Sequence, residues 1–219
     1  MQWYCPDLPG HGPSPSLACN PEAMVDFISR QKLGRPRIAL GYSMGARAVL
    51  LHAVNHPDYW DALILISVTA GLESESERAE RMQKDRALTE LLLSENTTAF
   101  LRYWQQTPII QSQQTIRSDW LETMQVNRRQ HTAKGLAASL QQFGQASYPN
   151  LWARLNKLYC PTLLITGRQD SKYCALAKRM EKLFPDAQWT CVPNSGHMTH
   201  LEAPERTAAL IRRFKNTVF

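Results

Sequence analysis

The chain has 219 residues, of which 43% are hydrophobic and 20% are charged. This length supports one sizeable hydrophobic core, and the composition excludes a generally disordered protein. The net charge of +6 would suit nucleic acid or an anionic small molecule. No nucleic-acid motif is present and the basic residues are not interleaved with aromatic ones, so we expect no nucleic-acid partner.

Strands and helices alternate at both ends of the chain. The expected strands cover residues 2–5, 37–41, 61–68, 162–166 and 187–192, and the expected helices cover 21–33, 46–55, 173–184 and 203–214. Asn20 and Pro21 mark the start of the first helix, and Gly34 marks its end. Strands that alternate with helices predict a parallel α/β sheet.

The middle of the chain differs in character. It is rich in Gln, Arg, Glu and Leu and contains no convincing strand. The expected helices there cover residues 73–95, 99–106, 113–127 and 136–145. We interpret residues 72–156 as a helical cap inserted into an α/β core formed by residues 1–71 and 157–219.

The longest clean apolar run, residues 62–66 extended by Val68, is too short to cross a bilayer. The first seven residues lack the basic and apolar regions of a signal peptide. The five cysteines show neither a C-x-x-C motif nor metal-ligand spacing, so we expect scattered buried thiols and no metal. The sequence favours a cytoplasmic protein that does not insert into a membrane.

The pentapeptide Gly41-Tyr42-Ser43-Met44-Gly45 stands between an expected strand and an expected helix. The pattern G-x-S-x-G in this context is typical of a nucleophile elbow, a tight turn that lifts a serine hydroxyl above the sheet. We expect Gly41 and Gly45 to flank Ser43 because side chains there would collide with neighbouring backbone. The alternative is a tight turn without chemistry.

Two later loops carry the side chains that such a serine needs. Asp170 follows the strand at 162–166, and His197 follows the strand at 187–192. A histidine takes the proton of the serine hydroxyl, and an acid orients the histidine. The order Ser, Asp, His places all three at the carboxyl edge of the sheet. His200 is a competitor for His197, and we expect it to lie beside the site or at the surface.

Six segments resemble one family closely. They are Asp7-Leu8-Pro9-Gly10-His11-Gly12, Gly41-Tyr42-Ser43-Met44-Gly45-Ala46-Arg47, Glu77-Arg78-Ala79-Glu80-Arg81, Tyr103-Trp104-Gln105-Gln106, Gly167-Arg168-Gln169-Asp170-Ser171-Lys172 and Gly196-His197. They run through nearly the whole chain. On them the chain resembles the α/β-hydrolase superfamily and, within it, the 2-succinyl-6-hydroxy-2,4-cyclohexadiene-1-carboxylate synthases of menaquinone biosynthesis.

The resemblance implies an α/β-hydrolase fold and a lyase that eliminates pyruvate from an enolpyruvyl-cyclohexene with three carboxylates. It implies that Ser43 is the base, that His197 activates Ser43 and that Asp170 holds the imidazole. The Met44 backbone N–H corresponds to an oxyanion donor. No cofactor or metal is implied, and the partner is a small polycarboxylate substrate bound by a monomer or homodimer.

The resemblance also implies the residues that bind substrate. Arg47, Arg81 and Arg128 match anion-binding arginines, which suit carboxylates better than lysine does. Tyr42 and Trp104 match pocket positions, although the family's Trp-Tyr order is reversed here, so that Tyr103 and Trp104 both stay candidates. Lys172 is a further candidate contact, and Arg129 adjoins Arg128.

Family members begin with additional strands, the third of which ends in a His-Gly motif that donates a second oxyanion N–H. The His11-Gly12 pair belongs to a later turn and does not replace it. We therefore hypothesise that Met1 is an internal or misassigned start, or that the chain is a fragment of a longer enzyme.

Three functions fit this pattern. The first is the pyruvate-eliminating lyase, and the second is a serine esterase or thioesterase that uses the same triad with Ser43 as nucleophile. The third is an inactive truncated homologue.

Overall fold

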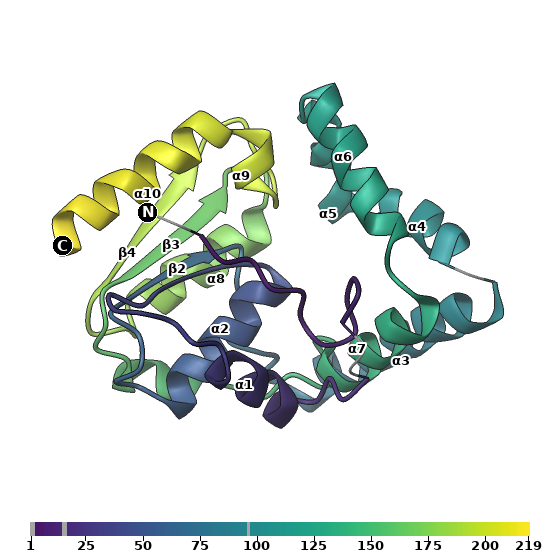
Figure 1. Ribbon diagram of the computed structural model, residues 1–219, viewed down its shortest axis with the longest axis horizontal. Helices are drawn as coiled ribbons and strands as arrows, with labels where there is room; N and C mark the ends of the chain where they lie inside the picture. The colour runs from purple at the N-terminus through teal and green to yellow at the C-terminus, as the bar shows by residue number, and fades with distance from the viewer. Residues whose placement is uncertain (1–2, 15–16, 96) are drawn as a thin grey trace.

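The computed structural model describes residues 3–14, 17–95 and 97–219, which form a parallel sheet flanked by helices (Figure 1). The strands are β1 (Ile38–Tyr42), β2 (Ala62–Ile66), β3 (Thr162–Gly167) and β4 (Ala187–Val192). They pair in the order β1-β2-β3-β4, and every pair is parallel. The predicted parallel α/β sheet is confirmed.

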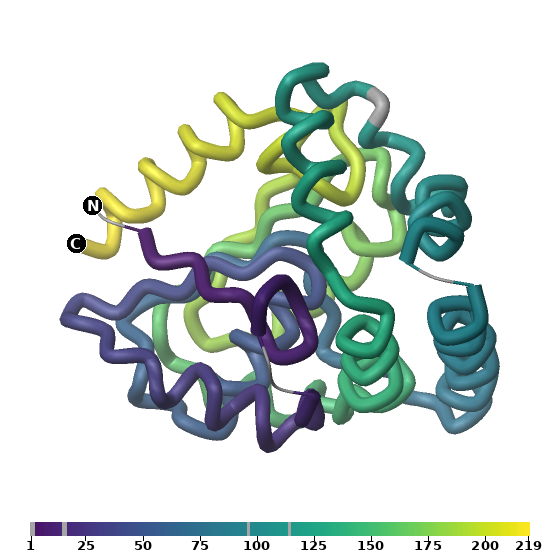
Figure 2. Tube along the Cα trace, turned by 45° about the vertical axis from the view of Figure 1, so that its right-hand side comes forward, coloured from purple at the N-terminus to yellow at the C-terminus, as the bar shows by residue number. Residues whose placement is uncertain are grey.

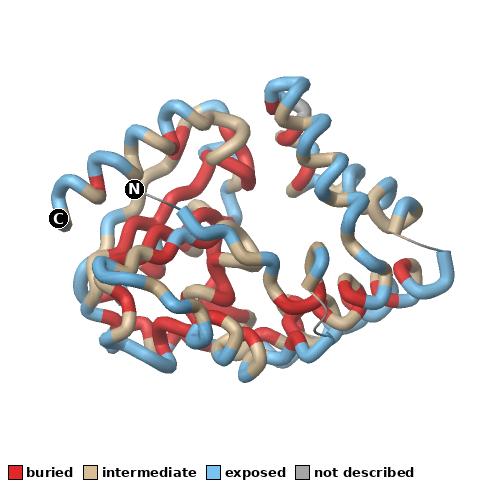
Figure 3. Tube along the Cα trace, in the orientation of Figure 1, coloured by how far each residue is buried: buried red, intermediate tan, exposed pale blue. Residues whose placement is uncertain are grey.

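Helices cover both faces of this sheet. The helices next to it are α1 (Pro21–Ser29), α2 (Met44–Asn55), α8 (Ser171–Glu181), α9 (Thr199–Glu202) and α10 (Pro204–Val218). Side chains of α1, α2 and α8 join Leu63 and Leu65 in one apolar cluster. Ile64 and Ile66 face the other way and pack against Phe214 of α10. β2 is therefore buried on both faces (Figure 3), which explains its continuous apolar sequence.

The remaining helices lie within residues 72–157, and residues 72–156 are called here the helical segment. They are α3 (Glu75–Ser94), α4 (Thr97–Gln105), α5 (Pro108–Gln111), η1 (Ser112–Thr115), α6 (Ser118–Arg129), α7 (Ala133–Phe143) and η2 (Trp152–Lys157). Figure 2 shows most of it as a separate lobe beside the sheet, with α3 and α7 packed together. None of its described residues forms a strand. Its role as a cap stays a prediction.

Close backbone contact joins this lobe to the loop at residues 7–13. A Cβ on Gly10 would overlap the Gly135 carbonyl of α7, and Gly10 has a φ of 80° that glycine adopts without strain. The Gly12 N–H donates to His131 Nδ1 at 2.8 Å. The D-L-P-G-H-G turn therefore serves as a contact surface for the helical segment.

Helix α1 begins where the sequence indicates but ends earlier. The Asn20 side chain accepts a hydrogen bond from the Ala23 N–H, and Pro21 occupies the first helical position. The helix stops at Ser29 rather than near residue 33. The Gln31 N–H bonds to the Ile28 carbonyl three residues back, which tightens the last turn and ends the α-helical pattern.

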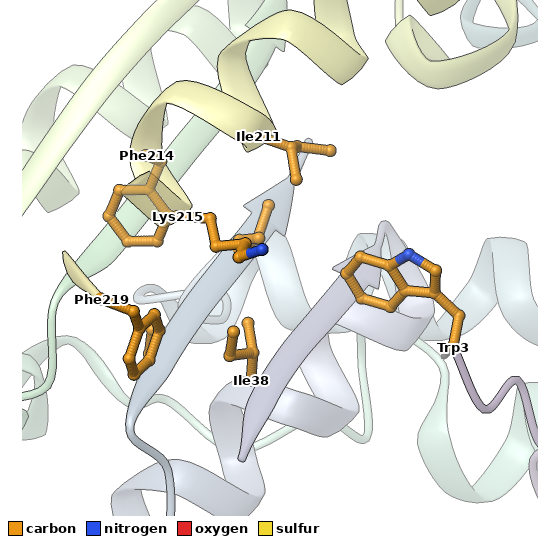
Figure 4. A pocket seen from close by; sticks show the side chains of 8 residues that line it. Trp3, Ile38, Ile211, Phe214, Lys215 and Phe219 are labelled. Atoms are coloured by element: carbon orange, nitrogen blue, oxygen red, sulfur yellow. The ribbon is translucent and has the colours of Figure 1, made fainter. Parts of the chain in front are cut away.

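The strand expected at residues 2–5 is wrong. Trp3, Tyr4 and Cys5 are in no strand and are exposed, and Gln2 lies outside the described residues. The Trp3 ring instead lines an apolar depression on the α10 side of the sheet with Ile38 and Phe219 (Figure 4). An aromatic pair such as Trp3-Tyr4 favours a strand only when a partner strand is available. No strand of the described residues pairs with the outer edge of β1.

No described helix combines the length and the apolar composition that crossing a membrane requires.

His52 of α2 is fully buried and predicts an acid-sensitive stability. Its Nδ1 accepts the Trp60 indole N–H at 3.0 Å, and its Nε2 lies 3.1 Å from Ser29 Oγ. Burial, with His56 nearby, lowers the pKa of His52 from 6.5 to about 4. The folded state therefore binds fewer protons than the unfolded state, so stability falls as the pH drops from 6.5 toward 4.

We predict that His52→Gln, which can keep both hydrogen bonds without titrating, loses about 2 kcal/mol less unfolding free energy over that pH range than the wild type does. Urea unfolding of both proteins at a series of pH values measures the difference. Identical pH profiles would contradict the assignment.

Candidate active site

Ser43 lies in a strained turn between β1 and α2. Its φ is 49° and its ψ is −107°, and its N–H donates to the Ile66 carbonyl of β2 at 2.9 Å. A Cβ at Gly41 would overlap the Ala46 backbone, as expected. The same expectation is wrong for Gly45, where a Cβ would meet no atom outside the helix itself. Only the first glycine is therefore required by space.

The turn places Ser43 in a hydrogen-bonded chain with the two predicted partners. His197 Nε2 lies 2.9 Å from Ser43 Oγ, and His197 Nδ1 lies 2.6 Å from Asp170 Oδ2. A carboxylate that accepts from Nδ1–H leaves Nε2 free to take the serine proton. The structure thus brings Ser43, Asp170 and His197 together in the geometry of a serine triad.

The loops that carry Asp170 and His197 are packed tightly on each other. A Cβ at Gly167 would overlap the carbonyl oxygens of Ser195 and Gly196. The Gln169 N–H donates to the Ser195 carbonyl, and Ser67 Oγ donates to the His197 carbonyl at 2.8 Å. The 2.6 Å bond between acid and imidazole therefore rests on close backbone contact between neighbouring strand ends.

Glu202 of α9 supports the histidine loop and was missed in the sequence. Its carboxylate accepts the N–H groups of Gly196 and Met198, on either side of His197, and the Ser112 hydroxyl of η1. The spacing of a Glu five residues after a loop histidine, at a helix end, is the signal that could have suggested it. Glu202 ties the helical segment to the histidine loop.

Aromatic rings enclose the imidazole. The Tyr173 ring lies 4.5 Å from the His197 ring, and the Tyr42 ring lies 5.4 Å from it. The competitor His200 packs on Tyr42 at 4.7 Å and bonds to neither Ser43 nor Asp170 among the described contacts. Burial, with His197 nearby, lowers the pKa of His200 to about 4, so its ring is neutral at pH 7. Tyr173 was not predicted.

Arg47 is a buried cation one turn into α2. Its side chain donates to the Phe143 carbonyl at 2.9 Å and lies over the rings of Phe143 and Tyr148. It belongs to none of the ion pairs that the described residues form, and burial lowers its pKa. The Asp85 carboxylate acts on Arg47 electrostatically but is ion-paired with Arg81. A buried charge with no ion-pair partner of its own is costly, so the site is suited to an anion.

The other two predicted arginines each have a side-chain hydrogen-bond partner. Arg81 lies near Arg47 but donates to Asp85 at 2.8 Å within α3. Arg128 donates to the buried Gln113 at 2.8 Å, interacts with Tyr42 and has its pKa lowered by burial. Arg128 therefore lies on the Tyr42 side of the triad, and Arg81 lies on the Arg47 side.

The last predicted residues differ in exposure. Trp104 is half-buried and stacks on Phe100 at 5.8 Å, whereas Tyr103 is 52% exposed. Trp104 is thus the more enclosed of the two rings. Lys172 is exposed on the first turn of α8. The Met44 N–H occupies the first position of α2, where no intrahelical acceptor exists, so it is free to meet an oxyanion.

Within the described residues, no three His, Cys, Asp or Glu side chains gather to hold a metal ion. The parallel sheet, the strand–turn–helix at Ser43 and the hydrogen-bonded Ser43, His197 and Asp170 are features typical of α/β hydrolases. The family profile of the Alpha/beta hydrolase family matches residues 2–210. The chain belongs to the α/β hydrolase family.

Individual relatives are more specific. The chain is 32% identical over 212 residues to a Bacillus subtilis protein provisionally named 2-succinyl-6-hydroxy-2,4-cyclohexadiene-1-carboxylate synthase, covering 97% of this chain and 77% of that one. It is 31% identical to the synthase of that name from Enterobacter sp., covering 94% and 78%. MenH from S. aureus superposes with a TM-score of 0.89 at 28% identity, covering 97% and 82%.

We predict that Glu202→Gln slows the modification of Ser43 by a serine-directed phosphonate about tenfold, because the new amide N–H opposes the Gly196 N–H and loosens the histidine loop. The rate of covalent labelling, followed by mass spectrometry, measures this effect.

Glu205→Gln is the matched control. Glu205 is exposed near the start of α10, and we expect labelling at the wild-type rate. Equal rates in both variants would show that Glu202 does not support the triad.

Proposed function

We propose that the protein is a lyase that eliminates pyruvate from 2-succinyl-5-enolpyruvyl-6-hydroxy-3-cyclohexene-1-carboxylate, giving 2-succinyl-6-hydroxy-2,4-cyclohexadiene-1-carboxylate for menaquinone biosynthesis. One observation carries the proposal. Arg47, a buried cation that forms no ion pair with any carboxylate of the described residues, lies one turn beyond the triad serine. A neutral ester does not require such a group, whereas a polycarboxylate does. The names of the relatives support the same activity.

In this proposal the triad removes a proton. His197 Nε2 accepts the Ser43 proton across the 2.9 Å contact, and the serine oxygen takes a ring C–H proton of the substrate. The electron pair of that C–H bond forms a ring double bond as the enolpyruvyl C–O bond breaks. The leaving enolate gains a proton and becomes pyruvate. Asp170 stabilises the imidazolium through its 2.6 Å bond to Nδ1.

The surrounding groups hold the substrate anions. Arg47 and Arg81 lie on one side of the triad, and Arg128 lies near Tyr42. Cations on two sides of the triad suit a ring whose carboxylates point in different directions, and each planar guanidinium can bind a carboxylate with two hydrogen bonds. In this proposal Tyr42 and Trp104 line the substrate and Lys172 is a more distant contact. The Met44 N–H stabilises the negative oxygen as charge develops.

The wider setting belongs to the same proposal. Residues 72–156 act as a cap over the triad, because Glu202 and the Gly10 contact join them to the core. The protein works as a monomer or homodimer in the cytoplasm on a small molecule. A serine esterase or thioesterase is the alternative, because the strained Ser43 and the adjacent Met44 N–H also suit nucleophilic attack.

We predict that Ser43→Ala lowers kcat for pyruvate release at least about a thousandfold, because the serine oxygen carries the proton. Pyruvate formation from the enolpyruvyl substrate, coupled to NADH oxidation, measures it. A wild-type rate in Ser43→Ala would overturn the triad mechanism. Absent pyruvate release together with hydrolysis of aryl esters by the wild type would favour the esterase.

We predict that Arg47→Ala lowers kcat/KM for the same substrate about a hundredfold, because a buried bidentate carboxylate contact is lost. Arg212→Ala removes an exposed arginine of α10 and serves as the matched control, with unchanged kinetics. Equal, small effects of both substitutions would contradict a substrate-binding role for Arg47.

A further inference from the structure

Two cysteine side chains face each other behind the Asp170 loop. Cys174 of α8 and Cys191 of β4 are separated by 17 residues, and their sulfur atoms lie 3.6 Å apart. A disulfide bond requires a sulfur–sulfur distance of about 2.0 Å. The two sulfur atoms must therefore approach each other by about 1.6 Å for the bond to form. The expectation of scattered thiols is therefore wrong for this pair.

The pair lies next to the candidate acid. Asp170 is the residue before α8, and the Cys174 N–H makes the first helical hydrogen bond to the Asp170 carbonyl. On the other side, Cys191 is the register partner of Thr166 in β3. Cys174 Sγ lies 3.3 Å from Thr166 Oγ1. The two thiols therefore bridge the start of α8 and the end of the β3–β4 ladder.

In the reduced state the Cys174 thiol supports the Asp170 turn. Its S–H donates to the Gly167 carbonyl at 3.2 Å, and the same carbonyl accepts the Asp170 N–H at 3.0 Å. Gly167 has no free space, since it is pressed against the Ser195 and Gly196 carbonyls. A displacement of Cys174 is thus transmitted to the turn that holds the acid and, through it, to the histidine loop.

Both thiols are partly accessible. Cys174 and Cys191 are half-buried, whereas Cys19 is fully buried and Cys5 is exposed. Among the described residues, no other two cysteines come within contact distance of each other. Burial, together with the neighbouring Cys191, raises the pKa of the Cys174 thiol, so less of it is present as the reactive thiolate at neutral pH.

We propose that Cys174 and Cys191 form a redox modification site that a low-molecular-weight disulfide converts to an intrachain disulfide, lowering the activity of the adjacent triad. One cysteine, as thiolate, attacks the small disulfide, forms a mixed disulfide and releases one small thiol. The second cysteine loses its proton, attacks the protein sulfur and releases the second small thiol. Two protein thiols are oxidised and one small disulfide is reduced to two thiols.

The consequence for the site follows from the lost hydrogen bond. Sulfur in a disulfide has no proton, so the bond from Cys174 to the Gly167 carbonyl disappears as the sulfur moves toward Cys191. The Asp170 turn loses this support, and the orientation of His197 becomes less favourable. This effect acts on the reactive step rather than on the arginines, so kcat falls and KM does not rise.

The experiment treats the full chain with oxidised glutathione and maps its peptides by mass spectrometry without reduction. We expect a Cys174–Cys191 linkage, a loss of two free thiols, and at least a threefold fall in the rate of Ser43 labelling by a serine-directed phosphonate, all reversed by dithiothreitol. Labelling does not require the proposed lyase substrate, so this test stands or falls separately from the proposed function. In the lyase assay kcat falls with the same reversibility.

Two variants keep the test decisive. Cys174→Ser retains a donor for the Gly167 carbonyl, and we expect it to fold, to label like the reduced wild type and to resist the change on oxidation. Cys5→Ser, which removes an exposed cysteine, responds to oxidation as the wild type does. The proposal is overturned if the oxidised protein shows only glutathione adducts at Cys174 or Cys191, or a linkage that leaves the labelling rate unchanged.

Discussion

The 2.6 Å bond between His197 and Asp170 depends on one constraint, the close contact of the two loops that leave neighbouring strands β3 and β4. At Gly167 the backbone of one loop touches the backbone of the other, with no room for a side chain between them. Parallel pairing aligns the two carboxyl strand ends, and glycine lets the loops meet. The imidazole can then reach Ser43, which the turn after β1 holds from the other side. The triad is thus a product of strand register.

Electrostatics separates this site from that of a simple esterase. Arg47 lies in the protein interior against a carbonyl group and two aromatic rings, none of which carries a negative charge. The free protein therefore bears a desolvation cost that an anionic ligand offsets when it binds. Arg81 avoids this cost through Asp85, and Arg128 reduces it through Gln113. In the proposed function, Arg47 is therefore the arginine that gains most from a substrate carboxylate.

Much of this arrangement could be predicted because its signals are local. The elbow, the loop acid and the loop histidine follow strands β1, β3 and β4, and the parallel order β1-β2-β3-β4 brings the ends of these strands to one edge of the sheet. The prediction of a strand at residues 2–5 was wrong because strand formation depends on a partner strand that the sequence does not reveal. The prediction that a side chain at Gly45 would collide with backbone was wrong because the space around a residue depends on the tertiary structure. Glu202, Tyr173 and the facing cysteines were missed because their importance lies in contacts with distant segments.

The Glu202 carboxylate bonds at once to η1 of the helical segment and to the backbone on both sides of His197. Because η1 and the histidine loop share one carboxylate, neither can become more rigid or more mobile without affecting the other. A ligand that rigidifies η1, for example through Arg128 and Gln113, also orders part of the histidine loop. The entropic cost of fixing that loop in its active geometry is then smaller. By reciprocity, a well-ordered imidazole strengthens the binding of such a ligand by the same free energy. In the proposed function, substrate recognition and proton transfer are therefore thermodynamically linked through Glu202, a side chain that performs neither.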